Sequence, residues 1–167
     1  MEAKQLKFQQ VNEKKGVYGL FVLIKSFFPY IEYSSQELEK MVLDKNHFYF
    51  LAKLNGPTIG FLHLKAEKEV ENKIENNLEK GPANENSLLK LCGMAVLEEF
   101  RKKGLGSKVL QKAVEFAKEK NFKKIFLYVH PKNEAAKNLY KKNCFVCVSH
   151  SAIEINKELV EKWERLL

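Results

Sequence analysis

A glycine-containing loop is the first feature of this sequence that predicts binding chemistry. It reads FRKKGLGS over 100–107, after an apolar run over 88–97 and before an amphipathic helical pattern over 107–120. Glycine lets the backbone approach a ligand closely, and the unpaired N–H groups of a helix's first turn attract anions. Because the loop also carries three basic residues at 101–103, we expect a strand–loop–helix unit that binds a polyanion. It is neither a Walker loop nor a complete dinucleotide fingerprint.

A second segment places polar and aromatic groups at helical spacing. It reads NEAAKNLY over 133–140. Asn133 is a good helix N-cap, and the small side chains of Ala135 and Ala136 allow close packing. Tyr140 follows Asn133 by seven residues, so that about two helical turns place both on one face. Taken alone, this segment fits a capped helix with a buried tyrosine as well as it fits a site.

Together the two segments resemble the GNAT superfamily of acetyl-CoA-dependent N-acetyltransferases. The match consists of R-x-x-G-x-G at 101–106, a strand at 125–129 and N-x-x-A-x-x-L-Y at 133–140. The sequence departs from the family at Cys144, where members commonly have Gly, and at Glu98, where they often have Pro. The resemblance implies one α/β domain over 1–167, with a single mixed, mostly antiparallel central sheet flanked by helices. It also implies acetyl-CoA as the acetyl-donor cosubstrate, and no metal.

The resemblance assigns roles to particular residues. Backbone groups of the loop would hold the pyrophosphate of acetyl-CoA, and the strand at 88–97 would pair with its pantetheine arm. A bulge in that strand would donate an N–H to the thioester carbonyl. Tyr140 would protonate the departing thiolate. The implied cofactor-binding residues are Met94, Val96, Arg101, Lys102, Lys103, Gly104, Leu105, Gly106, Ser107 and Asn133.

The acceptor is suggested by the segment FPYIEY at 28–33. It looks like the F-P-x-x-Y region of the protein N-terminal acetyltransferase branch, with one extra residue, and LYV at 127–129 resembles that branch's L-H-V. An aromatic staple between two helices is the structural alternative. We expect a peptide or protein α-amine as the acceptor; a small amine (polyamine, amino sugar or amino-acid derivative) or a catalytically silent CoA-binding module are the alternatives. The implied acceptor-binding residues are Phe28, Pro29, Tyr33 and Tyr128.

The general base is open at this point. His130 ends a predicted strand before Pro131, which favours a turn-capping role over catalysis, and His63 is expected to be half-buried and structural. The candidates for the base are Lys90, Tyr128, His130 and Glu134.

Hydrophobic periodicity predicts the remaining elements. The charged segment 66–87 is expected to be a mobile excursion, and 159–167 is helical in pattern. A capping box at Ser34–Glu37 opens a helix. We expect strands at 4–11, 47–54, 58–65, 88–97, 124–130 and 145–150, and helices at 17–28, 34–44, 107–120 and 133–142.

Composition limits the classes of function. The net charge is +8, yet all but two of the 29 basic residues are Lys, which indicates a solvated surface and makes nucleic-acid binding unlikely. No apolar run reaches the roughly 20 residues of a membrane span, so we expect a cytoplasmic protein. We expect a monomer or a homodimer, because exposed strand edges make dimers common in such folds. Cys92, Cys144 and Cys147 lie in apolar stretches and are expected to be reduced core residues.

Overall fold

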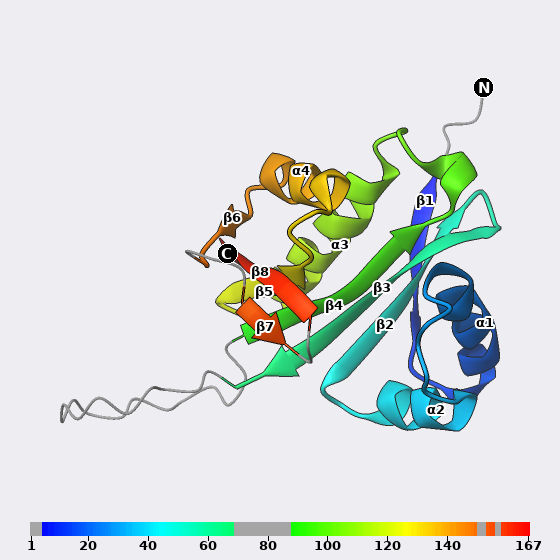
Figure 1. Cartoon of the computed structure of the whole chain (residues 1–167). Coiled ribbons are helices and arrows are strands. Elements are labelled where there is room, and N and C mark those ends of the chain that lie inside the picture. The colour runs from blue at the N-terminus through cyan, green and yellow to red at the C-terminus, as the bar shows by residue number, and fades with distance from the viewer. Residues whose placement is uncertain (1–4, 69–87, 150–152, 156–157) are drawn as a thin grey trace.

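The computed structural model describes residues 5–68, 88–149, 153–155 and 158–167 (Figure 1). The helices are α1 (Val17–Phe27), α2 (Ser35–Leu43), α3 (Leu105–Glu119) and α4 (Glu134–Lys142), with short 3₁₀ helices at Lys14–Gly16 and Glu98–Phe100. The strands are β1 (Leu6–Val11), β2 (His47–Leu54), β3 (Thr58–Glu67), β4 (Leu88–Val96), β5 (Lys124–Val129), β6 (Val146–Cys147), β7 (Ile153–Ile155) and β8 (Glu158–Leu166).

The strands form a mixed sheet in the order β1-β2-β3-β4-β5-β8-β6, and β7 pairs with β8. The pairing of β4 with β5 is parallel, and the other pairings are antiparallel. The predicted mixed, mostly antiparallel sheet flanked by helices is therefore confirmed.

The two faces of the sheet bury different residues because side chains alternate along a strand. Tyr49 and Phe61 pack with α1 and α2, whereas Phe50 and Leu62 belong to the cluster that contains α3 and part of α4. Figure 1 shows α1 and α2 on one face and α3 and α4 on the other. The helix pairs that precede and follow the central strands thus enclose the sheet from opposite sides.

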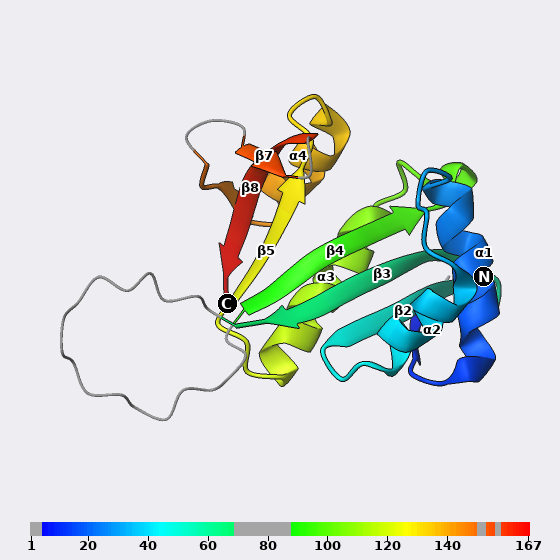
Figure 2. The same ribbon diagram turned by 60° about the horizontal axis from the view of Figure 1, so that its bottom comes forward.

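The sheet divides in its middle, where β4 and β5 diverge (Figure 2). Parallel pairing joins only 88–90 of β4 to 124–126 of β5, after which β4 continues beside β3 and β5 beside β8. β4 also carries a bulge: His63 pairs with Gly93 and Leu64 with Leu91, so Cys92 has no partner in β3. The expected irregularity in this strand is present.

One predicted element is wrong. Residues 159–167 have apolar residues three and four apart, yet Glu158–Leu166 forms β8. β8 lies between β5 and β6, and its buried residues Val160 and Trp163 lie on opposite faces of the strand. The resulting spacing of three mimics a helical period, and strand pairing overrides it.

Expectations about the cysteines and about two segments of the chain were also compared with the structure. Cys92, Cys144 and Cys147 are all solvent-exposed, so the prediction that they are core residues is wrong. Of the predicted excursion at 66–87, the first two residues end β3, and 69–87 lie outside the described residues, as does His150. Within the described part of the chain, no helix is long and apolar enough to cross a membrane.

Candidate active site

The predicted anion-binding loop lies at the start of α3. Gly104 immediately precedes the helix with φ +74°, a left-handed conformation that favours glycine. The N–H groups of a helix's first turn lack helical partners, and at this helix end no side chain caps them. A Cβ placed on Gly104 would meet no atom within 4 Å. The loop thus has open space beside unpaired N–H groups, which suits a pyrophosphate.

The basic residues hold the loop in place. The Arg101 Nε–H donates to the Val96 carbonyl oxygen (3.0 Å), which ties the loop to the end of β4. Lys103 Nζ donates to the Glu99 carbonyl oxygen (2.7 Å). Lys102 is exposed and has φ 58°. Arg101 and Lys103 therefore have structural contacts besides the charge they bring.

The start of α3 is packed against α4. The Asn143 side-chain amide donates to Ser107 Oγ (3.2 Å), and a Cβ on Gly106 would lie 3.5 Å from Leu139. Leu105 is buried. The sequence predicted these two segments to act together, and the structure brings them into contact.

The side chain of Tyr140, a residue of α4, is buried in the core. Only 9% of it is exposed, and its ring centroid is 5.9 Å from Phe145 and 6.5 Å from Trp163. Burial raises the pKa of its phenol to about 12. Tyr140 therefore carries its proton at neutral pH. Asn133 caps α4 as predicted, with Oδ1 accepting the Ala136 N–H (3.1 Å), so this oxygen is already engaged.

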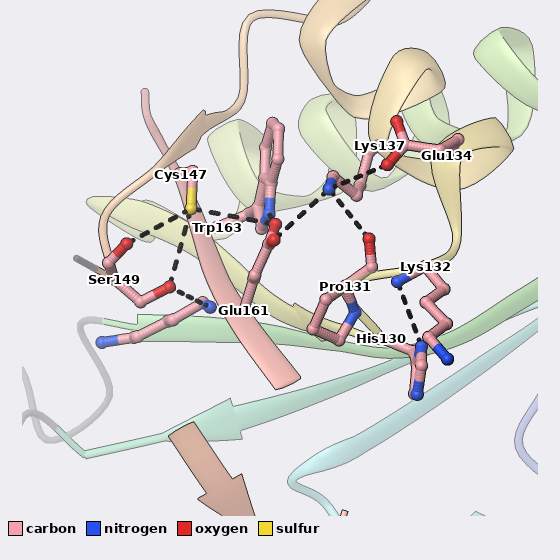
Figure 3. A network of polar contacts seen from close by, with 10 residues as sticks. His130, Pro131, Lys132, Glu134, Lys137, Cys147, Ser149, Glu161 and Trp163 are labelled. Carbon is pink, nitrogen blue, oxygen red and sulfur yellow. Dashed lines mark hydrogen bonds and ion pairs between the residues drawn. The ribbon is translucent and has the colours of Figure 1, made fainter. Parts of the chain in front are cut away.

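A polar network attaches α4 to β8 (Figure 3). Lys137 Nζ donates to the Pro131 carbonyl oxygen (2.9 Å) and contacts Glu134 (3.1 Å) and Glu161 (3.3 Å). Glu161 in turn accepts the indole N–H of Trp163 at 3.0 Å. The network fixes the helix that carries Tyr140 against the strand that covers it.

His130 lies at the turn before α4 (Figure 3). Its Nδ1 accepts the Lys132 backbone N–H at 3.1 Å. The predicted turn-capping contact is present, and it occupies one of the two ring nitrogens.

The edge of β4 beside the division offers backbone hydrogen-bonding groups. The Leu97 N–H donates to the Ile59 carbonyl oxygen, so in the antiparallel alternation Val96 and Met94 direct their backbone groups away from β3. Arg101 occupies the Val96 carbonyl. The groups of Met94 and the Val96 N–H face the side from which β5 has diverged, where the sequence predicted the pantetheine arm.

A pocket of about 130 Å³ lies between the α1–α2 connection and the β3–β4 part of the sheet. Phe28 and Tyr33 line it as predicted acceptor residues, whereas Pro29 and Tyr128 do not. Phe28 packs edge-on against Phe61, with centroids 6.0 Å apart. The complete lining consists of Ile24, Phe28, Tyr30, Ile31, Tyr33, Phe61, His63, Cys92 and Gly93.

The two predicted acceptor residues outside this pocket occupy other places. Tyr128 on β5 lies under Lys90, whose Nζ is 5.3 Å from the ring centroid. Lys90 also approaches Glu67 at 3.8 Å. Burial raises the pKa of the Tyr33 phenol, so this lining group is neutral at pH 7.

His63 is the pocket residue whose position the sequence analysis undervalued. It is half-buried as expected, but it lines the pocket. Its ring stacks on Tyr49 (centroids 4.0 Å apart), and its Nε2 lies 2.9 Å from Nδ1 of His47. The β2–β3 hairpin signal could have found this cluster, because it pairs Tyr49 with His63 and puts His47 on the same face.

No group of three or more His, Cys, Asp or Glu side chains in the described ranges is arranged to hold a metal ion.

Comparison with known proteins identifies the family. A model of the acetyltransferase (GNAT) family matches residues 17–144. An N-alpha-acetyltransferase from Sulfurisphaera tokodaii is 30% identical over 115 residues, which are 64% of this chain and 69% of the relative. The structure of Arabidopsis thaliana NAA60 in complex with acetyl-CoA has a TM-score of 0.71 at 23% identity, over 96% of each chain. Mutant forms of the spermidine/spermine N-acetyltransferase SpeG from Vibrio cholerae give 0.73 at 19%, over 97% of this chain and 94% of theirs.

The chain belongs to the acetyltransferase (GNAT) family. It is an acetyl-CoA-dependent acyltransferase.

Proposed function

We propose that this enzyme transfers the acetyl group of acetyl-CoA to the α-amine of a protein or peptide N-terminus. The observation that carries the proposal is the chemistry of the pocket beside the β4 bulge. Its walls are aromatic and aliphatic side chains with a neutral thiol and an imidazole, and none of the lining residues is a carboxylate. Such a pocket suits the apolar first side chain of a peptide.

The charges around the pocket argue against a polycation. Lys65 and Lys90 lie close enough to lower the pKa of His63, and Glu67 lies 3.6 Å and 3.8 Å from the two lysines. Glu67 is therefore already ion-paired with both lysines in this part of the sheet. A polyamine would bring further cations to it without a carboxylate among the residues that line the pocket.

The acceptor must attack as a neutral amine, and this favours an α-amine. An α-amino group has a pKa near 8 and costs about 1.4 kcal/mol to deprotonate at pH 7, whereas a lysine amine costs about 4.6 kcal/mol. Nearby positive charge lowers the pKa of an entering amine further. No covalent enzyme intermediate is required for direct attack.

The donor would lie along the division of the sheet. We assign its pyrophosphate to the N–H groups at 104–107 and its pantetheine arm to the backbone groups of Met94 and the N–H of Val96. Gly93 follows the bulge and lines the acceptor pocket, so the oxyanion-stabilising N–H belongs to this turn of β4. Tyr140, protonated at neutral pH, would supply the proton that the departing thiolate takes.

Two relatives point to the alternative of a small amine. They are the SpeG enzymes and the streptothricin acetyltransferase A of Bacillus subtilis, which is 36% identical over 64 residues, 38% of this chain and 37% of that relative. The lack of carboxylates in the pocket lining is the reason for preferring the peptide. We prefer the enzyme to a silent CoA-binding module because the chain belongs to the acetyltransferase family and because Tyr140 carries a proton that it could supply.

The test is acetyl-CoA-dependent acetylation of matched peptides that differ in their first residue. We expect kcat/KM to be highest for Met or Leu, and at least about tenfold lower for Asp or Lys, since a charge in an apolar pocket loses its hydration. Equal rates for all first residues, or turnover of spermidine alone, would contradict the proposal.

A pair of variants tests the location of the acceptor. Phe28→Ala removes an aromatic wall and should raise the peptide KM several-fold while the KM for acetyl-CoA stays unchanged. Tyr18→Ala on α1 is the matched control, because Tyr18 is 74% exposed and does not line the pocket. If the two variants behave alike, the acceptor does not use this pocket.

A further inference from the structure

Two imidazoles in direct contact remain unused by the chemistry described so far. His63 lines the acceptor pocket, and its Nε2 lies 2.9 Å from Nδ1 of His47. The two rings are stacked with centroids 5.2 Å apart, and Tyr49 stacks against both, at 4.0 Å from His63 and 6.4 Å from His47. The pair therefore joins the pocket to the beginning of β2 through one short hydrogen bond.

We propose that His63 and His47 form a proton relay that carries the proton released by the acceptor amine out of the pocket. This inference rests on the proposed function, because it assigns the missing general base for the same reaction. It differs from the candidates that the sequence offered, which lie on β4, on β5 and at the start of α4.

The hydrogen bond determines which atoms act. Nε2 of His63 is engaged with His47, so Nδ1 is the ring nitrogen left for the pocket. When the amine nitrogen bonds to the acetyl carbon and the C–S bond breaks, the amine proton passes to His63 Nδ1. The Nε2 proton of His63 passes to His47 Nδ1, and His47 releases its Nε2 proton to solvent. The thiolate takes one proton from Tyr140, which solvent replaces, so protons balance.

The charged groups around the pair keep it in the accepting form. Burial is the main cause that lowers the pKa of His63, to about 3, and His47, Lys65 and Lys90 lower it further. Burial also lowers the pKa of His47, opposed by Asp44 and Glu67 and assisted by Lys65. His63 is therefore neutral at physiological pH, so its ring can accept a proton. The hydrogen bond to His47, and not a matched pKa, is what makes it a relay group that passes the proton on.

A structural role alone makes a different prediction. If the stacked rings only pack β2 against β3, an isosteric amide that keeps the hydrogen bond would preserve function. His63→Gln tests this directly, because the amide can still bond to His47 but cannot pass a proton. His47→Gln tests the outer half of the relay at the half-buried partner. His130→Gln tests the competing histidine among the candidate bases, whose Nδ1 already accepts the Lys132 backbone N–H.

The experiment measures kcat and KM from pH 6 to 9.5 for the three variants, with the best amine acceptor of the wild type. We expect His63→Gln to lower kcat by about 10²-fold or more at pH 7, the usual contribution of a general base. The deficit should shrink towards pH 9.5, where hydroxide replaces the base, and added imidazole should restore part of the rate. His47→Gln should lose about tenfold, and His130→Gln should match the wild type.

The relay is overturned if His63→Gln retains kcat within about threefold, if its loss is the same at every pH, or if His130→Gln is the variant that fails. A readout independent of turnover is the ¹⁵N spectrum of the ring nitrogens in the free enzyme. We expect an unprotonated Nδ1 on His63 at pH 7, and a protonated Nδ1 would refute the assignment. Activity on small amines alone would contradict the peptide proposal. The relay would still be tested, because kcat of the variants would then be measured with that small amine.

Discussion

The low pKa of His63 makes the stability of the fold depend on pH in a window where few other groups titrate. The imidazole is neutral in the native state, with a pKa near 3, and takes up a proton near pH 6.5 once the chain unfolds. Between these values the unfolded state binds more protons, so acid favours unfolding. The stabilisation of the neutral form is complete above pH 6.5 and is lost as the pH falls.

The magnitude follows from the two pKa values. Relative to pH 7.5, this site alone lowers the free energy of unfolding by about 2 kcal/mol at pH 5. His47 acts in the same direction with a smaller effect. The carboxylates whose pKa is lowered, on Glu37, Glu161 and Glu164, titrate below this window. The window from pH 5 to 7.5 therefore lies above the titration of these three carboxylates.

The assay is urea unfolding of the wild type and of His63→Gln at half-unit steps across that window. Trp163 is the only tryptophan and is 2% exposed, so its fluorescence reports global unfolding. We expect the wild-type curve to fall by about 2 kcal/mol more than the variant's curve. Parallel curves for the wild type and His63→Gln would refute the reasoning that burial holds this imidazole neutral.

Three further predictions concern the donor site and the sheet. Gly106→Ala should fold normally, because its Cβ would lie 3.5 Å from Leu139. Both Gly106→Ala and Gly106→Val should weaken acetyl-CoA binding measured by calorimetry, and the valine variant should weaken it more. Normal affinity in both variants would mean that the pyrophosphate lies elsewhere. Tyr140→Phe should lower kcat by about 10²-fold in steady-state assays with acetyl-CoA affinity unchanged, and an unchanged chemical step would remove Tyr140 from its role. Gly60→Ala should cost about 1–3 kcal/mol in urea unfolding, because its Cβ would lie 2.2 Å from the Ala95 carbonyl oxygen; a stability equal to that of the wild type would contradict this close approach.

Local signals were sufficient for the parts of the fold that depend on neighbouring residues. The capping box of Ser34 and Glu37 and the Asn133 cap begin helices where the sequence predicts them. The loop at 101–106 precedes α3, although the helix begins at Leu105, two residues earlier than expected. These features depend on hydrogen bonds within a few residues, which a single sequence encodes directly.

Long-range pairing accounts for what was missed. β8 has a helical spacing of apolar residues, and only its position between β5 and β6 makes it a strand. His63 reads as an ordinary hairpin residue until the α1–α2 connection encloses it in the pocket. Cys144 illustrates the reverse. The sequence departs at this position from the glycine that is common in the family it resembles. The structure gives a reason for that glycine, because the φ of Cys144 is +62°, a left-handed conformation.

The most direct test of the account offers the enzyme two amines in one tube with acetyl-CoA. One is a peptide with an N-terminal Met and an internal Lys, and the other is spermidine at equal concentration. Mass spectrometry with fragmentation then locates every acetyl group. The account predicts acetylation at the Met α-amine, with the lysine side chain and spermidine unmodified. Acetyl groups on spermidine with none on the peptide α-amine would contradict it.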